Sequence, residues 1–565
     1  MPAPDAVEAA AAPDRYLAAR SGQTRDALAR TVSALVAHER ATLASLVAIH
    51  WLAVLAFALT VRHNGWAYYQ GGDQIWLTTT GWLLGEGELA PTYIGYGWPL
   101  ALAPITMVTG PGYVAAMPAV IALNVLVLAP LALWAVHGLA ARIAGRAFGL
   151  LAAAVWVAAP FAVIPLWRDD YHERYVEQFL PQALGLTALA DYLSLVLLLV
   201  AAYVFVRALD SGSAHEAVAA GLVAGFAVGT KPSNALYLAA PLAAVLLTRR
   251  WRAGLVFALA LAPAILTLAL WKQRGLGTLP LFALEETRLA AASLAVPNVD
   301  RYLDVDWAVM KDNGAHLREY FWSARLLEWL PLAGAVAVVR RSAPLAALLG
   351  TWFGVFLLLK GSNEFSLVSS GSFFRFMMPA YPAYFLLALS VVLLVPTAGR
   401  RLTAAWPTRP SLPVRPRTMA VLAAVLGLLP LLVVAVVRPI GHPPPAIFVD
   451  NILTPVDAAI DVAVRAEGEA RVVTWSHSSP GRANVFYRVY RTAADGRDMA
   501  CADHGGAADC TMQMLLLGTT REPRWRDGSP PPGAEYRIGI GTNSRDDATA
   551  GDVFLISRAV DARVS

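Results

Sequence analysis

The chain has 565 residues, of which 57% are hydrophobic and 15% are charged, and its mean hydropathy is +0.52. This composition excludes an ordinary soluble protein of this length, which would carry more charged surface. The net charge is +5, but the basic residues form short clusters between apolar runs. They therefore indicate membrane topology, and no nucleic-acid partner is expected.

The first 42 residues are rich in alanine and mixed in charge, with no pattern of a cleavable signal peptide. Residues 1–42 are predicted to form a cytoplasmic N-terminal segment. The first apolar run then remains as a membrane anchor.

Apolar runs recur along the chain as far as residue 438. A bilayer core about 30 Å thick requires roughly 20 apolar residues per helical span. Two apolar segments, 73–84 and 98–110, are too short and are predicted to lie at the outer interface. About eleven spans are predicted, at 43–61, 113–138, 147–166, 184–206, 215–230, 234–248, 253–271, 327–339, 344–359, 376–396 and 419–438.

The short loops between these spans predict the orientation. With the N-terminus in the cytoplasm, each short loop on that side carries arginine, for example the cluster Arg249, Arg250 and Arg252. This distribution obeys the positive-inside rule. We therefore expect a multi-pass plasma-membrane protein with long outer loops at 62–112, 167–183 and 272–326, and with its C-terminal domain outside.

The C-terminal part changes in composition. Residues 397–418 are rich in proline and arginine and predict a cytoplasmic linker before the last span at 419–438. Residues 456–565 alternate in the manner of strands, which predicts a small extracytoplasmic β-sandwich. Cys501 and Cys510 are the only cysteines. Outside the cell they can form a disulfide, and the alternative is two unpaired thiols.

Three stretches resemble the GT-C superfamily of membrane glycosyltransferases, which includes dolichyl-phosphate-mannose and lipid A aminoarabinose transferases. Residues 70–105, QGGDQIWLTTTGWLLGEGELAPTYIGYGWPLALAPI, are similar to its first outer loop. AGLVAGFAVGTKPSNALYLAAPLAAVLL and FFRFMMPAYPAYFLLAL resemble later parts of its layout. The resemblance covers 43–396 and implies a mainly α, polytopic GT-C-like domain, while the C-terminal strands resemble a fibronectin type III module.

The resemblance also implies a reaction. An inverting enzyme of this kind moves a sugar from a polyprenyl-phosphate donor to a glycan, lipid or protein acceptor of the cell envelope. Asp73 occupies the position of the catalytic base, and a helix-capping role is the compatible alternative. Lys231 lies in a tight turn between two short apolar helices, and we interpret it as a ligand of the donor phosphate together with Arg375. Snorkelling to the interface is the alternative for Lys231.

The second outer loop, PLWRDDYHERYVEQF, concentrates ionisable groups beside a span. Asp169 and Asp170 are further catalytic candidates, and His172 and Glu173 are candidates for binding an acceptor or a metal. The alternative is a solvated loop with internal ion pairs. A divalent cation such as Mg²⁺ or Mn²⁺ is a candidate cofactor that the spacing leaves open.

A membrane transporter or lipid flippase is the alternative function. Such proteins place ionisable residues near the middle of the bilayer and often contain repeated halves. In this sequence the charges gather in the outer loops, and the two halves do not match.

Overall fold

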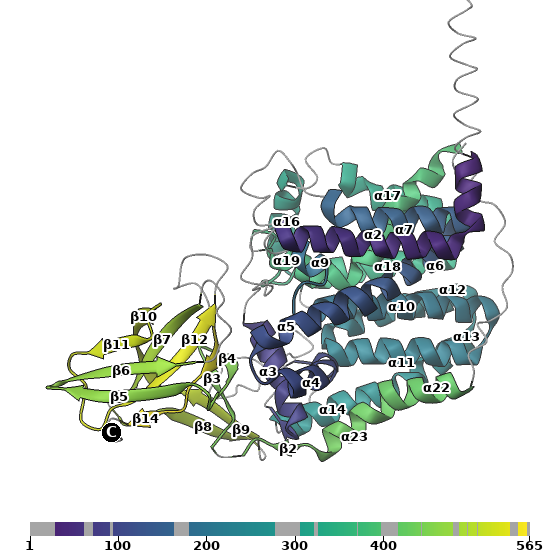
Figure 1. Cartoon of the computed structure of the whole chain (residues 1–565). Coiled ribbons are helices and arrows are strands. Elements are labelled where there is room, and N and C mark those ends of the chain that lie inside the picture. The colour runs from purple at the N-terminus through teal and green to yellow at the C-terminus, as the bar shows by residue number, and fades with distance from the viewer. Residues whose placement is uncertain are drawn as a thin grey trace, which may run out of the picture.

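A computed structural model describes residues 29–60, 72–90, 94–162, 180–276, 305–320, 326–369, 371–396, 416–441, 443–477, 485–493, 495–504, 507–542 and 552–561. A bundle of helices is followed by a β region that lies at one end of the bundle (Figure 1). This arrangement confirms the prediction of a mainly helical membrane domain followed by β structure.

The helical elements up to residue 276 are α2 (Glu39–Thr60), α3 (Asp73–Gly85), α4 (Gly97–Thr109), α5 (Tyr113–Ala122), η1 (Leu123–Leu128), α6 (Ala129–Ala144), α7 (Arg146–Ala162), α9 (Leu180–Ala183), α10 (Ala190–Ser211), α11 (Ala214–Thr230), η3 (Pro232–Leu238), α12 (Ala239–Thr248), α13 (Trp251–Ala260) and α14 (Ala262–Leu276). Those that follow are α16 (Trp307–Tyr320), α17 (Leu326–Val339), α18 (Ala343–Lys360), α19 (Ser372–Met377), η4 (Met378–Ala380), α20 (Tyr381–Leu389), η5 (Ser390–Leu394), α22 (Pro416–Ala423), η6 (Ala424–Leu428) and α23 (Leu429–Val436).

Seven helices of the described chain are long and apolar enough to cross a membrane, and each falls on a predicted span. The other four predicted spans correspond to shorter apolar helices at Arg146–Phe161, Ala214–Thr230, Pro232–Thr248 and Glu328–Val339. The two segments that the sequence predicts to lie at the outer interface, 73–84 and 98–110, form helices α3 and α4. Helix α10 begins at Ala190, later than the predicted residue 184, because the chain turns at Gly185, which has a φ of +76°.

The break between α11 and α12 has a local cause. The residue before a proline is pushed toward extended backbone, and Lys231, which precedes Pro232, has φ −141° and ψ 109°. Helix α11 therefore ends at Thr230, and a short 3₁₀ turn leads into α12. The pair of short helices joined at Lys231 follows directly from the sequence TKPSN.

The β region contains three sheets besides the short pair β1 (Glu88–Leu89) and β2 (Arg438–Pro439). The largest sheet has the order β10-β7-β12-β13, with β14 paired to β12, and the others have the orders β11-β6-β5 and β4-β3-β9-β8. The strands are β3 (Ala446–Val449), β4 (Ile452–Pro455), β5 (Asp461–Glu467), β6 (Ala470–Ser476), β7 (Val485–Thr492), β8 (Met499–His504), β9 (Ala507–Met512), β10 (Met514–Thr520), β11 (Arg524–Asp527), β12 (Glu535–Thr542), β13 (Val553–Ile556) and β14 (Val560–Asp561).

The largest sheet and the β11-β6-β5 sheet share one core. Val473 of β6, Val489 of β7 and Ile538 of β12 are fully buried in the same cluster, and the rings of Trp475 and Tyr487 meet at 5.2 Å. Strands β3 and β4 precede residue 456, so β structure extends N-terminal to the predicted domain. Two antiparallel sheets packed on a common core form the sandwich arrangement.

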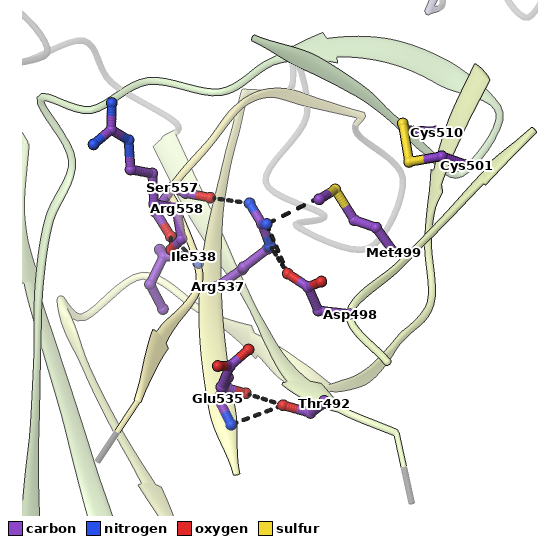
Figure 2. Close-up of polar contacts among 10 residues, drawn as sticks. All are labelled: Thr492, Asp498, Met499, Cys501, Cys510, Glu535, Arg537, Ile538, Ser557 and Arg558. Atoms are coloured by element: carbon purple, nitrogen blue, oxygen red, sulfur yellow. Dashed lines mark hydrogen bonds and ion pairs between the residues drawn. A yellow bond between two sulfur atoms is a disulfide. The ribbon is translucent and has the colours of Figure 1, made fainter. Parts of the chain in front are cut away.

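Strand β8 is tied to this sandwich by Arg537 of β12 (Figure 2). Its guanidinium donates to Asp498, just before β8, at 2.7 and 3.1 Å and to the carbonyl of Ser557 at 2.8 Å. Cys501 and Cys510 face each other on β8 and β9 and form a disulfide, also visible in Figure 2. The four-stranded sheet is therefore held by an ionic contact in addition to its strand pairing.

The β region packs directly on helix α3. The ring of Trp76 on α3 meets that of Phe448 on β3 edge to face, at 5.4 Å between centroids. Leu83 of α3 and Leu453 of β4 belong to the same buried cluster. Strand β1, just after α3, pairs in parallel with β2, which follows the last membrane helix. Helix α3 is thus fixed by contacts with both the bundle and the β region.

Candidate functional site

Four charged side chains, three on helices and one in the turn after α11, form a continuous ionic network. Arg375 on α19 pairs with Asp73 on α3, and its Nε donates to Asp191 on α10 at 3.1 Å. The Nζ of Lys231 pairs with the other oxygen of Asp191. Asp73 is about half exposed, at 49%, whereas the Asp191 side chain is 2% exposed. The network therefore runs from the surface into the protein: Asp73 contacts Arg375, and Asp191 joins Arg375 to Lys231.

Asp73 is the first residue of α3, where the helix dipole favours a carboxylate. It does not act as the N-cap, because Gly72 occupies that position and no side-chain capping bond is formed. A Cβ at residue 72 would lie 2.1 Å from the side chain of Ile452 on β4. A larger residue at position 72 would therefore require the Ile452 side chain to move, so the start of α3 packs closely on the β region.

Lys231 is positioned by close backbone packing. A Cβ at Gly95 would lie 2.2 Å from the carbonyl oxygen of Gly229, and one at Gly97 would lie 2.3 Å from the hydroxyl of Thr230. The amide of Asn234 also donates to the carbonyl of Ala227 at 2.8 Å. The glycines of the first outer loop thus allow that loop to contact the turn that carries Lys231.

Arg375 follows a tightly held loop. Asn313 of α16 is 1% exposed, and its side-chain amide donates to the carbonyls of Gly361 and Ser366 and accepts from the backbone N–H of Val368. Gly371, with a φ of +79°, then begins α19. These contacts fix the start of the short helix on which Arg375 lies.

Asp191 is the residue of this network that the sequence interpretation missed, since it falls inside the predicted span 184–206. The available signal was an aspartate within an apolar run, which marks either a helix start or a functional position. The structure shows the helix start, together with two ion pairs that Asp191 forms. Asp191 lies in the first turn of α10 and is 1% exposed. A carboxylate buried this deeply requires charged partners, and Lys231 and Arg375 supply them.

A cavity of about 390 Å³ lies beside the network. Its walls are apolar and aromatic, and they include Phe373 and Met377 on the helix of Arg375 and Tyr192 next to Asp191. The lining continues along the same membrane span as far as Val392. The cavity can therefore hold an elongated apolar molecule, and its wall includes direct sequence neighbours of Asp191 and Arg375.

Four of the predicted site residues, Asp169, Asp170, His172 and Glu173, lie outside the described residues. Within the described ranges, no group of three or more His, Cys, Asp or Glu side chains is placed to hold a metal ion. The structure therefore assigns no metal ligands.

The chain matches no known family model, and no curated protein matches it. Among solved structures, it is similar to the crystal structure of the Archaeoglobus fulgidus oligosaccharyltransferase in the apo form, with a TM-score of 0.36 and 14% sequence identity. The similarity covers 69% of this chain and 55% of that chain.

Proposed function

We propose that this protein is a membrane glycosyltransferase of the GT-C type. It moves a sugar from a polyprenyl-phosphate donor to a glycan, lipid or protein acceptor of the cell envelope. The observation that carries the proposal is the ionic network that joins Asp73 to Arg375, Asp191 and Lys231 beside the apolar cavity. A carboxylate, two cations and an apolar cavity are the groups that this transfer requires.

In the proposed reaction, Asp73 removes the proton from the acceptor hydroxyl, whose oxygen attacks the anomeric carbon of the sugar. The bond from that carbon to the phosphate oxygen breaks, and its electron pair leaves with the polyprenyl phosphate. Attack opposite the leaving group inverts the anomeric configuration. The half exposure of Asp73, at 49%, suits a base that meets an acceptor arriving from outside the protein.

Lys231 and Arg375 bind the donor phosphate in this proposal, and Asp191 holds both cations in place. Electrostatic stabilisation is effective when the charged groups are already oriented before reaction. Asp169 and Asp170 are proposed as additional catalytic residues, and His172 and Glu173 as acceptor or metal ligands. No step of the proposed reaction depends on a metal.

The polyprenyl chain is assigned to the cavity. A lipid tail gains little from the hydrophobic effect on leaving the bilayer, because its surroundings are already apolar. Shape and aromatic contact must therefore provide recognition. The rings of Tyr381 and Phe385 both contact the ring of Trp156 on the cavity wall, with centroid distances of 5.3 and 5.1 Å. These three rings supply such a surface.

The topology proposed for this function has the N-terminus in the cytoplasm and the network and β region outside. Figure 1 supports one part of it, since α3, α9 and α19 lie at the end of the bundle that faces the β region. The β region would then bind or orient a glycan acceptor or dock a partner. The network also lies at helix ends rather than at mid-span, unlike the midplane sites of transporters.

The test is sugar release and transfer from a panel of synthetic polyprenyl-phosphate sugars by the purified full chain. Asp73→Asn should lose turnover by about 10²-fold or more and keep donor binding. Lys231→Ala should weaken donor binding. Asp312→Asn is a matched control, because Asp312 on α16 is exposed to a similar degree, at 55%. Wild-type protein that is inert with every donor but moves a lipid or solute across liposomes would support the transporter alternative instead.

A further inference from the structure

The start of helix α10, which carries Asp191 in its first turn, has no side-chain cap. Leu189 occupies the N-cap position with extended backbone and forms no capping hydrogen bond, since leucine offers no side-chain acceptor. Polar N-cap residues commonly fix the start of a helix. The position of Asp191 therefore depends on the contacts that hold residues 185–188, the turn before the helix.

Asn124 holds this turn from another membrane span. It is 1% exposed, and its side-chain Nδ2 donates to the carbonyl of Gly185 at 2.9 Å and to that of Thr187 at 3.1 Å. The partners are 61 and 63 positions away along the chain, so both bonds are tertiary contacts. Gly185 permits the approach, because a Cβ at that residue would lie 2.9 Å from the Cβ of Asn124.

The backbone around Asn124 departs from a regular α-helix. Leu123–Leu128 (η1) form a π-helical turn, in which the backbone N–H of Ala129 donates to the carbonyl of Asn124. Such turns are rare and frequently occur at functional sites. A buried amide within an apolar span is costly unless its donors are paired. The hydrogen bonds to the turn before α10 meet this requirement.

Trp98 holds the same turn from helix α4. Its side chain is fully buried, and its Nε1 donates to the carbonyl of Ala188 at 2.6 Å. Its neighbour Gly97 packs against Thr230, the residue directly before Lys231. The start of α4 therefore contacts both turns that the ion pair of Lys231 joins.

We propose that Asn124, together with Trp98, is a positioning residue for the donor-phosphate site. By holding the turn before α10 it places Asp191, which orients Lys231 and Arg375. Charged groups bind and stabilise a ligand best when they are oriented before it arrives. This inference rests on the proposed function and extends its phosphate site to supporting residues on two further helical elements.

The test is equilibrium binding of polyprenyl phosphate and of uncharged polyprenol to the full chain in nanodiscs. The ratio of the two affinities measures recognition of the phosphate separately from recognition of the chain. Asn124→Leu keeps a similar side-chain volume and removes both donors. It should reduce the ratio about threefold to twentyfold, the scale of one hydrogen bond between membrane helices, and leave polyprenol affinity unchanged. A purely structural defect would weaken both ligands alike.

Three further variants sharpen the test. Trp51→Phe is the matched control, because it removes a hydrogen bond of 2.9 Å to the carbonyl of Val125 in the same π-helical turn, and it should leave the ratio unchanged. In an Asp191→Asn background, Asn124→Leu should have no further effect on the ratio, because changes that act through one residue are not additive. If Asn124→Leu does not fold, Trp98→Phe removes the other hydrogen bond to the turn and should reduce the ratio in the same way.

The outcomes separate the two proposals. An unchanged ratio in Asn124→Leu, equal loss of both ligands, the same loss in Trp51→Phe, or full additivity with Asp191→Asn overturns the positioning role and leaves the proposed function standing. Wild type that binds polyprenyl phosphate no better than polyprenol overturns the phosphate site on which both proposals rest.

Discussion

Replacing Phe448 tests whether the β region positions the helix that carries Asp73. Phe448 is 2% exposed, and its ring packs edge to face on Trp76 of α3. A buried Phe→Ala change costs about 3–5 kcal/mol, of which the aromatic pair contributes about 0.5–1.5 kcal/mol. Because 1.4 kcal/mol corresponds to a factor of ten, local opening of α3 should become about 10²- to 4 × 10³-fold more frequent in Phe448→Ala.

The assay is hydrogen exchange, read by mass spectrometry on the full chain in nanodiscs. Amides of α3 should exchange faster in Phe448→Ala by that factor, while those of α10 keep their wild-type rates. Phe486→Ala is the matched control, since Phe486 is 1% exposed on β7 within the sandwich. It should destabilise the sandwich without altering α3. Unchanged exchange of α3 in Phe448→Ala would refute the reasoning that the β region holds this helix.

Three further predictions concern other parts of the molecule. Contact with His477, whose Nε2 lies 3.6 Å from the carboxylate, lowers the pKa of Asp457. The stability that this carboxylate contributes should therefore be present above pH 3.8 and lost as the pH falls through its lowered folded-state value. Asp457→Asn should destabilise the β region at pH 7 and lose this effect at the acidic end of a pH series of thermal unfolding. Cys501→Ser should lower the stability of the β region by about 2–3 kcal/mol in denaturant titrations, because the disulfide closes only a short loop. Gly95→Ala should weaken donor binding, because its Cβ would lie 2.2 Å from a backbone carbonyl of the turn before Lys231; overpacking of this kind costs about 1–3 kcal/mol, and unchanged donor affinity would contradict the close packing.

The membrane helices could be predicted because apolar length is a local property. In the described ranges, all seven long apolar helices coincide with predicted spans, and Pro232 marked the break after α11 through its effect on the preceding residue. The start of α10 was placed too early. A hydropathy window averages over the turn at Gly185 and over the single charge of Asp191, and so both were absorbed into one apolar segment.

The candidate site could be predicted only in part, because its contacts join distant residues. Asp73 and Arg375 are separated by 302 positions, and no periodicity or spacing links them. Nothing in the sequence places Phe448 against Trp76, although their rings are in contact. These contacts arise from tertiary packing, which composition and hydropathy do not specify.

A structure of the full chain with polyprenyl phosphate bound is the most direct test of the central claim. The account predicts that the phosphate contacts Lys231 and the Arg375 guanidinium, with the prenyl chain in the cavity lined by Phe373 and Tyr381. Asp73 should then face the side of the phosphate where the sugar and acceptor would lie. A lipid bound elsewhere on the protein, with the ionic network undisturbed and the cavity empty, would contradict it.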